Sequence, residues 1–353
     1  MLLQLSKKKR NRERVMADQW KELSGERNWE GLLKPLNGDL QKRIELYGER
    51  IKAIYYSMTD DKRHPTHEKE DLFSKVIMKT DKFGKLYTVT DYIYAMSDVS
   101  SCIDWIVKDQ SAWIGYVAVA TDKGKEVLGR RDILICWRGT HSKAEGMKDL
   151  EFSRTQASNI LGKTHNPHVH KGFLSVYKSP NTEPACNNLS ARDQVLNAVN
   201  RLVNKFDYRH EEISITVTGH SLGAALATLN ATDIVFNKHN ECRGSEKKCM
   251  VTAFAFGSPK VGDKGFRNVF NGLNNLHLLN IRNKGDIVTR VPPYPYKKVG
   301  TKLEIGSYRK GLYKLSEDTI AKLKNRHQFP SLPQNLSQFH RLDEYLCVIA
   351  GMQ

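Results

Sequence analysis

Apolar residues recur along this chain with two different spacings. Between Leu40 and Tyr55 they repeat every three or four positions, which predicts an amphipathic helix. Further helices are predicted over residues 191–206, 222–236 and 265–273. Short apolar runs bounded by polar or glycine-containing segments predict strands over residues 86–89, 113–121, 132–137, 213–217, 251–256 and 277–281. A turn is predicted over Thr121–Gly124, between two of these strands.

Strands and helices alternate through the second half of the chain. Such alternation is typical of an α/β fold, in which a mostly parallel sheet carries helices on both faces. The chain has 353 residues and shows no internal repeat or low-complexity tract. This length suits one large α/β domain or two ordinary ones.

The charge balance is the most unusual part of the composition. Lys and Arg number 56 against 39 Asp and Glu, a formal net charge of +17. Residues 1–15 hold six basic side chains and one acidic side chain, and we expect them to form a disordered basic extension. The other basic residues are scattered without a recognised nucleic-acid motif, so nucleic acid is not an expected partner. The longest apolar run, Trp113–Ala120, is too short for a transmembrane segment, which needs roughly 18 to 20 residues.

The cysteines indicate a reducing compartment. There are six in the chain, sparse for its length, and none lies in a Cys-x-x-Cys pair. We expect free thiols and a cytoplasmic location.

The segment Gly219–Gly223 has the pattern Gly-x-Ser-x-Gly between a predicted strand and a predicted helix. This context is the one in which a sharp turn presents a nucleophilic serine at the sheet edge. Ser221 is the candidate nucleophile. The sharp turn that presents it is expected to include Gly219, His220 and Gly223. The N–H of Leu222, at the start of the helix, is a candidate donor to an oxyanion.

A nucleophilic serine needs a histidine base and a carboxylate, which in the α/β-hydrolase order follow it along the chain. Asp263 and Asp286 both follow predicted strands, and Asp286 is favoured because Gly285 permits the turn that presents it. The histidines that follow Asp286 along the chain are His327 and His340. His340 is favoured because it precedes an apolar-periodic helix, whereas His327 lies in a basic loop flanked by prolines.

A second oxyanion donor is predicted at the end of the strand that precedes Gly139. Thr140 offers an N–H and a hydroxyl there, although a plain strand-to-loop turn explains the same residues. The remaining histidines, among them His165, His168 and His170, lack acidic or thiol partners at metal-ligand spacing, so no metal site is expected.

The polar, weakly periodic segment 141–170 has two open interpretations. It could be a lid at a lipid interface or an ordinary surface loop. The lid interpretation depends on its scattered apolar residues, which are Met147, Leu150, Phe152, Ile160 and Leu161.

These motifs together resemble the plant class II phospholipases A1, a group within the class 3 lipases. The resemblance runs along most of the chain from Trp20. The motifs occur in the order of that family and are Trp20–Gly25, Trp29–Leu33, Trp113–Thr121, Leu128–Ile133, Trp137–Thr140, Val169–Phe173, Ser190–Gln194, Gly219–Gly223 and Gly257–Gly262.

The resemblance implies a single domain over residues 16–353 with an α/β-hydrolase fold, and a triad of Ser221, Asp286 and His340. It also implies hydrolysis of the sn-1 ester of a glycerophospholipid to a free fatty acid and a 2-acyl lysophospholipid, without metal or other cofactor. Family members begin near Met16 and usually continue for several tens of residues beyond the last predicted helix.

Two alternatives to a phospholipase A1 stay open. The same triad suits a triacylglycerol lipase, a galactolipid lipase or an esterase. A non-catalytic lipase-like signalling module is of a different class, and the complete triad argues against it. For an enzyme acting on lipid, the basic charge favours peripheral binding to a phospholipid membrane surface.

Overall fold

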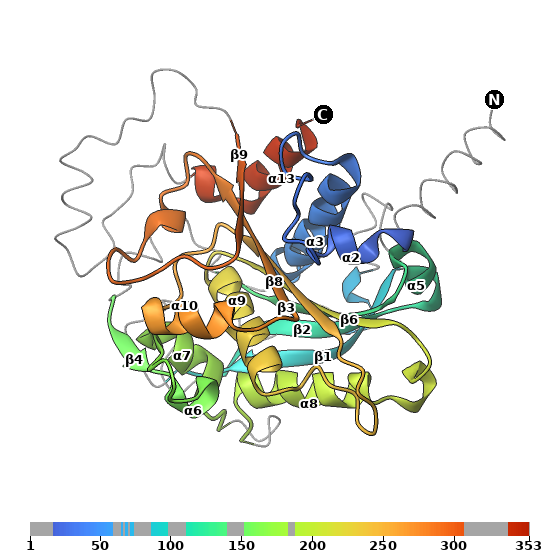
Figure 1. The fold of residues 1–353 in the computed structure, drawn as a ribbon, viewed down its shortest axis with the longest axis horizontal. Helices are drawn as coiled ribbons and strands as arrows, with labels where there is room; N and C mark the ends of the chain where they lie inside the picture. The colour runs from blue at the N-terminus through green and yellow to red at the C-terminus, as the bar shows by residue number, and fades with distance from the viewer. Residues whose placement is uncertain are drawn as a thin grey trace.

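A seven-stranded sheet forms the centre of the molecule in the computed structural model, which describes residues 17–58, 65, 68–69, 71–73, 86–97, 111–139, 152–182, 188–306 and 338–352 (Figure 1). The strands are β1 (Tyr87–Ala95), β2 (Ala112–Ala120), β3 (Arg131–Trp137), β6 (Ile213–His220), β7 (Met250–Phe256), β8 (Leu276–Asn283) and β9 (Thr301–Ile305). They lie in the order β1-β2-β3-β6-β7-β8-β9. The β1–β2 and β2–β3 pairs are antiparallel, and every later pair is parallel.

Helices cover both faces of this sheet, which confirms the predicted α/β architecture. They are α2 (Trp20–Leu23), α3 (Gly38–Tyr56), α5 (Asp122–Leu128), α6 (Ser158–Leu161), α7 (Lys171–Lys178), α8 (Ala191–Val203), α9 (Leu222–Phe236), α10 (Lys264–Asn271) and α13 (Leu342–Ala350). One hydrophobic core joins one face of the sheet to α7, α8, α9 and α10. The other core joins the opposite face to α3 and α13.

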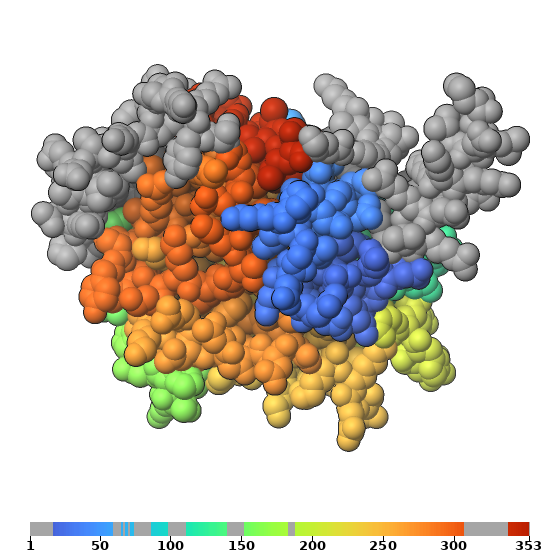
Figure 2. Space-filling view, turned by 45° about the horizontal axis from the view of Figure 1, so that its top comes forward, coloured from blue at the N-terminus to red at the C-terminus, as the bar shows by residue number. Residues whose placement is uncertain are grey.

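The last helix packs against the long helix near the start of the chain. Figure 2 shows α13 in red beside α3 in blue. The Gln41 side-chain amide donates to the Ile349 carbonyl at 2.8 Å, and Leu346 lies so close to Gly48 that a Cβ there would overlap it. Segments about 300 residues apart in the sequence are thereby held together.

Helix α9 lies unusually close to the sheet. A Cβ on Gly223 would overlap the Trp137 carbonyl of β3, and one on Gly219 would overlap the backbone of Gly223. Every residue of α9 from Leu222 to Ile234 is buried. The small residues of this segment therefore let a helix begin directly at the end of β6, as the sequence predicts.

The predicted turn at Thr121–Gly124 is wrong, because α5 begins there. The Thr121 hydroxyl accepts a hydrogen bond from the Gly124 N–H at 3.0 Å and so caps the helix. Threonine at this position is a usual helix start signal. The helix ends at Leu128 and is followed by Gly129, which has φ of 78°. β1 is longer than predicted, and β9 and α7 were not predicted.

The described part of the 141–170 segment is ordered against the core. It contains β4 (Arg154–Gln156), α6 and β5 (His168–His170), and β4 pairs with β5. Ile160 and Leu161 are buried in the core under α9, so they are not exposed side chains of a lid. Met147 and Leu150 lie outside the described residues, as does the predicted extension over residues 1–15.

Among the described helices, none combines the length and the apolar composition that crossing a membrane requires.

Candidate active site

Ser221 occupies a strained position between β6 and α9. Its φ and ψ are 59° and −122°, a conformation that residues other than glycine rarely adopt. Its backbone N–H donates to the Phe256 carbonyl of β7 at 2.9 Å, which anchors the turn to the neighbouring strand. The turn therefore presents the Ser221 hydroxyl at the carboxyl edge of the sheet, as expected of a nucleophile in this motif.

The structure brings Ser221, His340 and Asp286 together from three separate segments. His340 Nε2 lies 2.7 Å from Ser221 Oγ, and His340 Nδ1 lies 2.8 Å from Asp286 Oδ2. Ser221 and Asp286 are buried, and the His340 side chain is 11% exposed. Both distances are within the range of a nucleophile, a base and an orienting carboxylate.

The Asp286 carboxylate has two further hydrogen bonds that fix its orientation. Oδ1 accepts from the Val288 N–H at 2.9 Å, and Oδ2 accepts from the Tyr345 hydroxyl at 2.6 Å. Burial, and then the nearby Asp286, raise the pKa of Tyr345 well above its usual range, so this hydroxyl remains a donor. Tyr345 belongs to α13, so the packing of that helix on α3 also positions the acid.

His220 supports the base from the opposite side. Its Nε2 lies 2.6 Å from the His340 carbonyl oxygen, and its Nδ1 lies 3.0 Å from the Tyr55 hydroxyl of α3. Because a carbonyl oxygen only accepts, His220 Nε2 carries the proton. Burial, and then the nearby His340, lower the pKa of His220 well below its usual range. A neutral His220 therefore holds the His340 backbone in place.

Sequence reasoning missed Tyr345 and Tyr55 as supports of the triad. Both tyrosines fit the apolar spacing of their helices, so the sequence pattern alone assigns them to the core and does not indicate a polar role for their hydroxyl groups. The polar roles follow only from the tertiary contacts, in which Tyr345 of α13 donates to Asp286 and Tyr55 of α3 contacts His220.

The Leu222 N–H lies at the start of α9, where helical N–H groups have no acceptor within the helix. Gly139, at the end of β3, lies against this turn, because a Cβ on it would overlap the His220 carbonyl. Thr140, the second predicted oxyanion donor, lies outside the described residues. The geometry places its neighbour Gly139 beside the nucleophile turn.

The alternative acid does not lie with the triad. Asp263 caps α10 by accepting from the Phe266 N–H at 3.0 Å, and it also accepts from the His168 N–H at 3.2 Å. The alternative base His327 lies outside the described residues. Among the described residues, no group of three or more His, Cys, Asp or Glu side chains is placed to hold a metal ion.

This arrangement can perform nucleophilic acyl transfer. A histidine within hydrogen-bond distance of the serine can take its proton, and the buried carboxylate can hold the imidazole in the required tautomer. The start of α9 directly follows Ser221, and the N–H groups at a helix start favour negative charge of the kind that develops on an attacked carbonyl.

Comparisons with known proteins agree with this chemistry. A family model described as Lipase (class 3) matches residues 134–296. Phospholipase A1-II 1 from Oryza sativa subsp. indica is 42% identical over 96% of this chain and 83% of its own length. Phospholipase A1-IIgamma from Arabidopsis thaliana is 39% identical over 96% of this chain and 80% of its own length.

Solved structures share the fold at lower identity. Lipase II from Rhizopus niveus is 22% identical, with a TM-score of 0.50 over 76% of this chain and 81% of its own. A mutant form of MDLA from Penicillium cyclopium is 20% identical, with a TM-score of 0.50 over 80% of this chain and 85% of its own. These matches support an α/β-hydrolase fold.

Proposed function

This chain belongs to the plant class II phospholipases A1 of the class 3 lipase family, and from this we propose that it hydrolyses the sn-1 ester of glycerophospholipids. The products are a free fatty acid and a 2-acyl lysophospholipid. The observation that carries the proposal is the contact of Ser221 with His340, and of His340 with Asp286, in a chain with these relatives.

In the proposed reaction, His340 Nε2 removes the proton of Ser221 Oγ as this oxygen attacks the sn-1 carbonyl carbon. Asp286 stabilises the imidazolium that forms. The N–H groups of Leu222 and Thr140 stabilise the oxyanion, and each such donor lowers the barrier by roughly 3 kcal/mol. His340 then protonates the lysophospholipid oxygen as it leaves, and afterwards activates the water that releases the fatty acid.

Product analysis on phospholipids with two different acyl chains tests this proposal. From vesicles of 1-palmitoyl-2-oleoyl phosphatidylcholine, we expect palmitate and a 2-oleoyl lysolipid, identified by mass spectrometry after a rapid quench. The lipid with the two chains exchanged is the matched control and should release oleate. Release of the same fatty acid from both lipids would show a chain preference in place of a positional one. Faster hydrolysis of triacylglycerol or galactolipid would favour the alternative lipases.

We also propose that the protein binds a phospholipid surface peripherally and acts in the cytoplasm. The net charge of +17 supports peripheral membrane binding, since each Lys or Arg near an anionic membrane contributes about 1 kcal/mol to the binding free energy. A cytoplasmic location is consistent with the free thiols of Cys136, Cys242, Cys249 and Cys347, and cell fractionation would test it.

Peripheral binding of this kind should depend on salt and on lipid charge. We expect co-sedimentation with anionic vesicles at low salt to fall several-fold at high salt, because dissolved ions screen the attraction between charges. Neutral phosphatidylcholine vesicles are the control and should bind less at low salt. Binding that is indifferent to both salt and lipid charge would contradict the proposal.

A further inference from the structure

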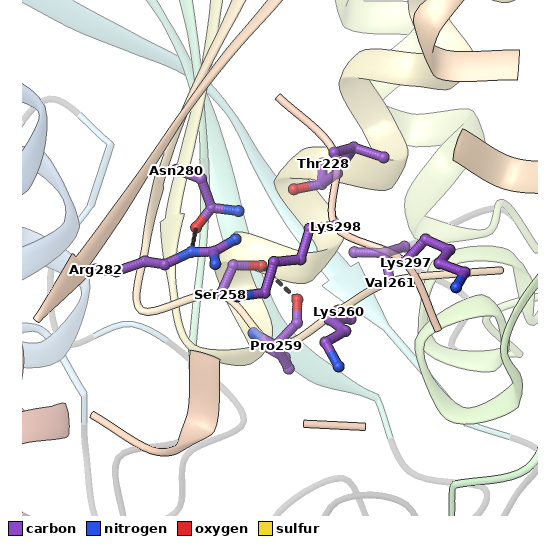
Figure 3. A pocket seen from close by; sticks show the side chains of 10 residues that line it. Thr228, Ser258, Pro259, Lys260, Val261, Asn280, Arg282, Lys297 and Lys298 are labelled. Atoms are coloured by element: carbon purple, nitrogen blue, oxygen red, sulfur yellow. Dashed lines mark hydrogen bonds between the residues drawn. The ribbon is translucent and has the colours of Figure 1, made fainter. Parts of the chain in front are cut away.

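A small basic pocket lies at the carboxyl edge of the sheet, between α9, β8 and the segment before β9. We call it the cationic pocket, and the residues used below are Ser258, Lys260, Asn280, Arg282, Lys297 and Lys298. In Figure 3, Arg282 and Asn280 extend from β8 and Arg282 points toward Ser258 and Lys298. Ligands of open α/β sheets bind at this edge.

The cationic pocket adjoins the triad without including it. Ser258 directly follows Gly257, and a Cβ on Gly257 would lie 3.1 Å from Asp286 Oδ2 and 3.2 Å from His340 Cε1. Thr228, which also lines the pocket, lies on α9 seven residues after Ser221, roughly 10 Å along the helix axis. The cationic pocket therefore begins beside the triad at Ser258 and extends to a point roughly 10 Å along α9.

Four basic side chains meet in the cationic pocket. Arg282 is 6% exposed, and the hydrogen bond of its guanidinium is from Nε to Asn280 Oδ1 at 3.0 Å. Lys260 Nζ donates to the Pro292 carbonyl at 2.7 Å. None of Lys260, Arg282, Lys297 and Lys298 forms an ion pair with a carboxylate in the part of the chain that the structure describes.

The pKa values of Lys260 and Arg282 are both lowered, as expected for basic groups that are partly buried close together. Burial, and then Lys298, Arg282 and Lys297, lower the pKa of Lys260 to about 8. Burial lowers the pKa of Arg282, and Tyr345, Glu304 and Asp286 only partly oppose this. Clustered cations in a partly buried place are costly unless an anion offsets them.

We propose that the cationic pocket binds a phosphate group. Arg282 supplies the planar guanidinium that suits phosphate oxygens, and the lysines supply point charges around it. The pocket itself holds about 10 Å³, room for roughly one water molecule, so in this proposal the phosphate binds over its opening. Lys297 is half-buried and Lys298 is exposed there, so both can adjust to a ligand. The phosphate comes from a lipid headgroup or from solution, and both sources share this chemistry.

Calorimetric titration of the whole protein with inorganic phosphate tests the proposal. We expect one phosphate per chain, with affinity about 10- to 100-fold weaker in Arg282→Met, because a charge-assisted hydrogen bond is lost. Since Arg282 is buried and its replacement could affect folding, Lys297→Met and Lys298→Met give independent tests near the surface. Each should weaken phosphate binding several-fold.

Lys178→Met is the matched control, because Lys178 is an exposed lysine at the end of α7, and it should bind phosphate like the unmodified protein. No phosphate binding, or binding that is equal in all variants, would overturn the proposal. Competition between phosphate and phosphatidylcholine vesicles would assign the pocket to the lipid headgroup, and phosphate binding without competition would assign it to free phosphate. The titration needs no hydrolysis, so its failure is distinct from failure of the proposed function.

Discussion

Replacing Ser221 by alanine should lower the turnover of a soluble short-chain ester by about 10⁶-fold, as in other hydrolases that use a triad. The expected loss is large because, in the proposed reaction, the Ser221 hydroxyl oxygen forms the acyl intermediate, and neither His340 nor Asp286 can replace it. Alanine has the same Cβ as serine, so the strained turn should be retained. Initial rates measured with a chromogenic ester, compared at equal protein concentration, give the ratio.

Ser111→Ala is a matched control for that variant. Ser111 is also a buried serine, and its hydroxyl accepts from the Asn181 amide at 2.8 Å, at the start of β2. We expect its activity to stay close to that of the unmodified protein. If Ser221→Ala retained most of its hydrolysis, Ser221 would not be the nucleophile. If the unmodified protein and Ser111→Ala were both inactive on esters and on phospholipids, the non-catalytic signalling module would be the better interpretation.

The sequence predicts the members of the triad because its chain order restricts the choice sharply. Only two histidines follow Asp286, and only one of them precedes an apolar helix. The strand, turn and small-residue helix around Ser221 are similarly local, so their pattern is visible in consecutive residues. In the structure His340 lies within hydrogen-bond distance of both Ser221 and Asp286.

The supports of the triad could not be predicted in the same way. Tyr345 contacts Asp286 across 59 positions and Tyr55 contacts His220 across 165, so neither contact leaves a local pattern. β9 was missed although Thr301–Ile305 alternates between exposed and buried residues, because the strand has only five residues. Pairing with β8 stabilises it, and that pairing is a tertiary contact.

A buried charged cluster under α3 was also hidden from sequence reasoning. Gly129–Arg131 suggests a polar entry to the strand that is predicted to begin at Asp132, and charged residues are rarely fully buried. In the structure Arg130 and Asp132 have no exposed side-chain surface, and Arg130 Nη2 lies 3.5 Å from Asp132 Oδ1. Arg43 of α3 is buried beside them, and burial, followed by Arg130, lowers the pKa of Arg43.

The Asp132 carboxylate is the hydrogen-bond acceptor at the centre of this cluster. Its Oδ1 accepts from the hydroxyl groups of Ser214 at 2.6 Å and Thr216 at 2.8 Å. Its Oδ2 accepts from the hydroxyl groups of Tyr87 at 2.6 Å and Tyr47 at 3.1 Å. The four hydroxyl groups join β1, β6 and α3 to β3 through one side chain, so this carboxylate links the sheet to a helix that supports the active site.

Asp132→Asn should therefore lower the free energy of unfolding by about 3–5 kcal/mol, because two buried guanidinium groups would lose their counter-charge. Urea denaturation at neutral pH, followed by circular dichroism, measures the change in midpoint at constant slope. Asp122→Asn is the matched control, since it removes the same charge from a side chain that is 86% exposed and paired with Arg131. That change should cost at most about 1 kcal/mol. Equal costs for the two variants would show that the buried carboxylate adds no stability beyond that of a surface ion pair, and that Arg43 and Arg130 are compensated by other groups.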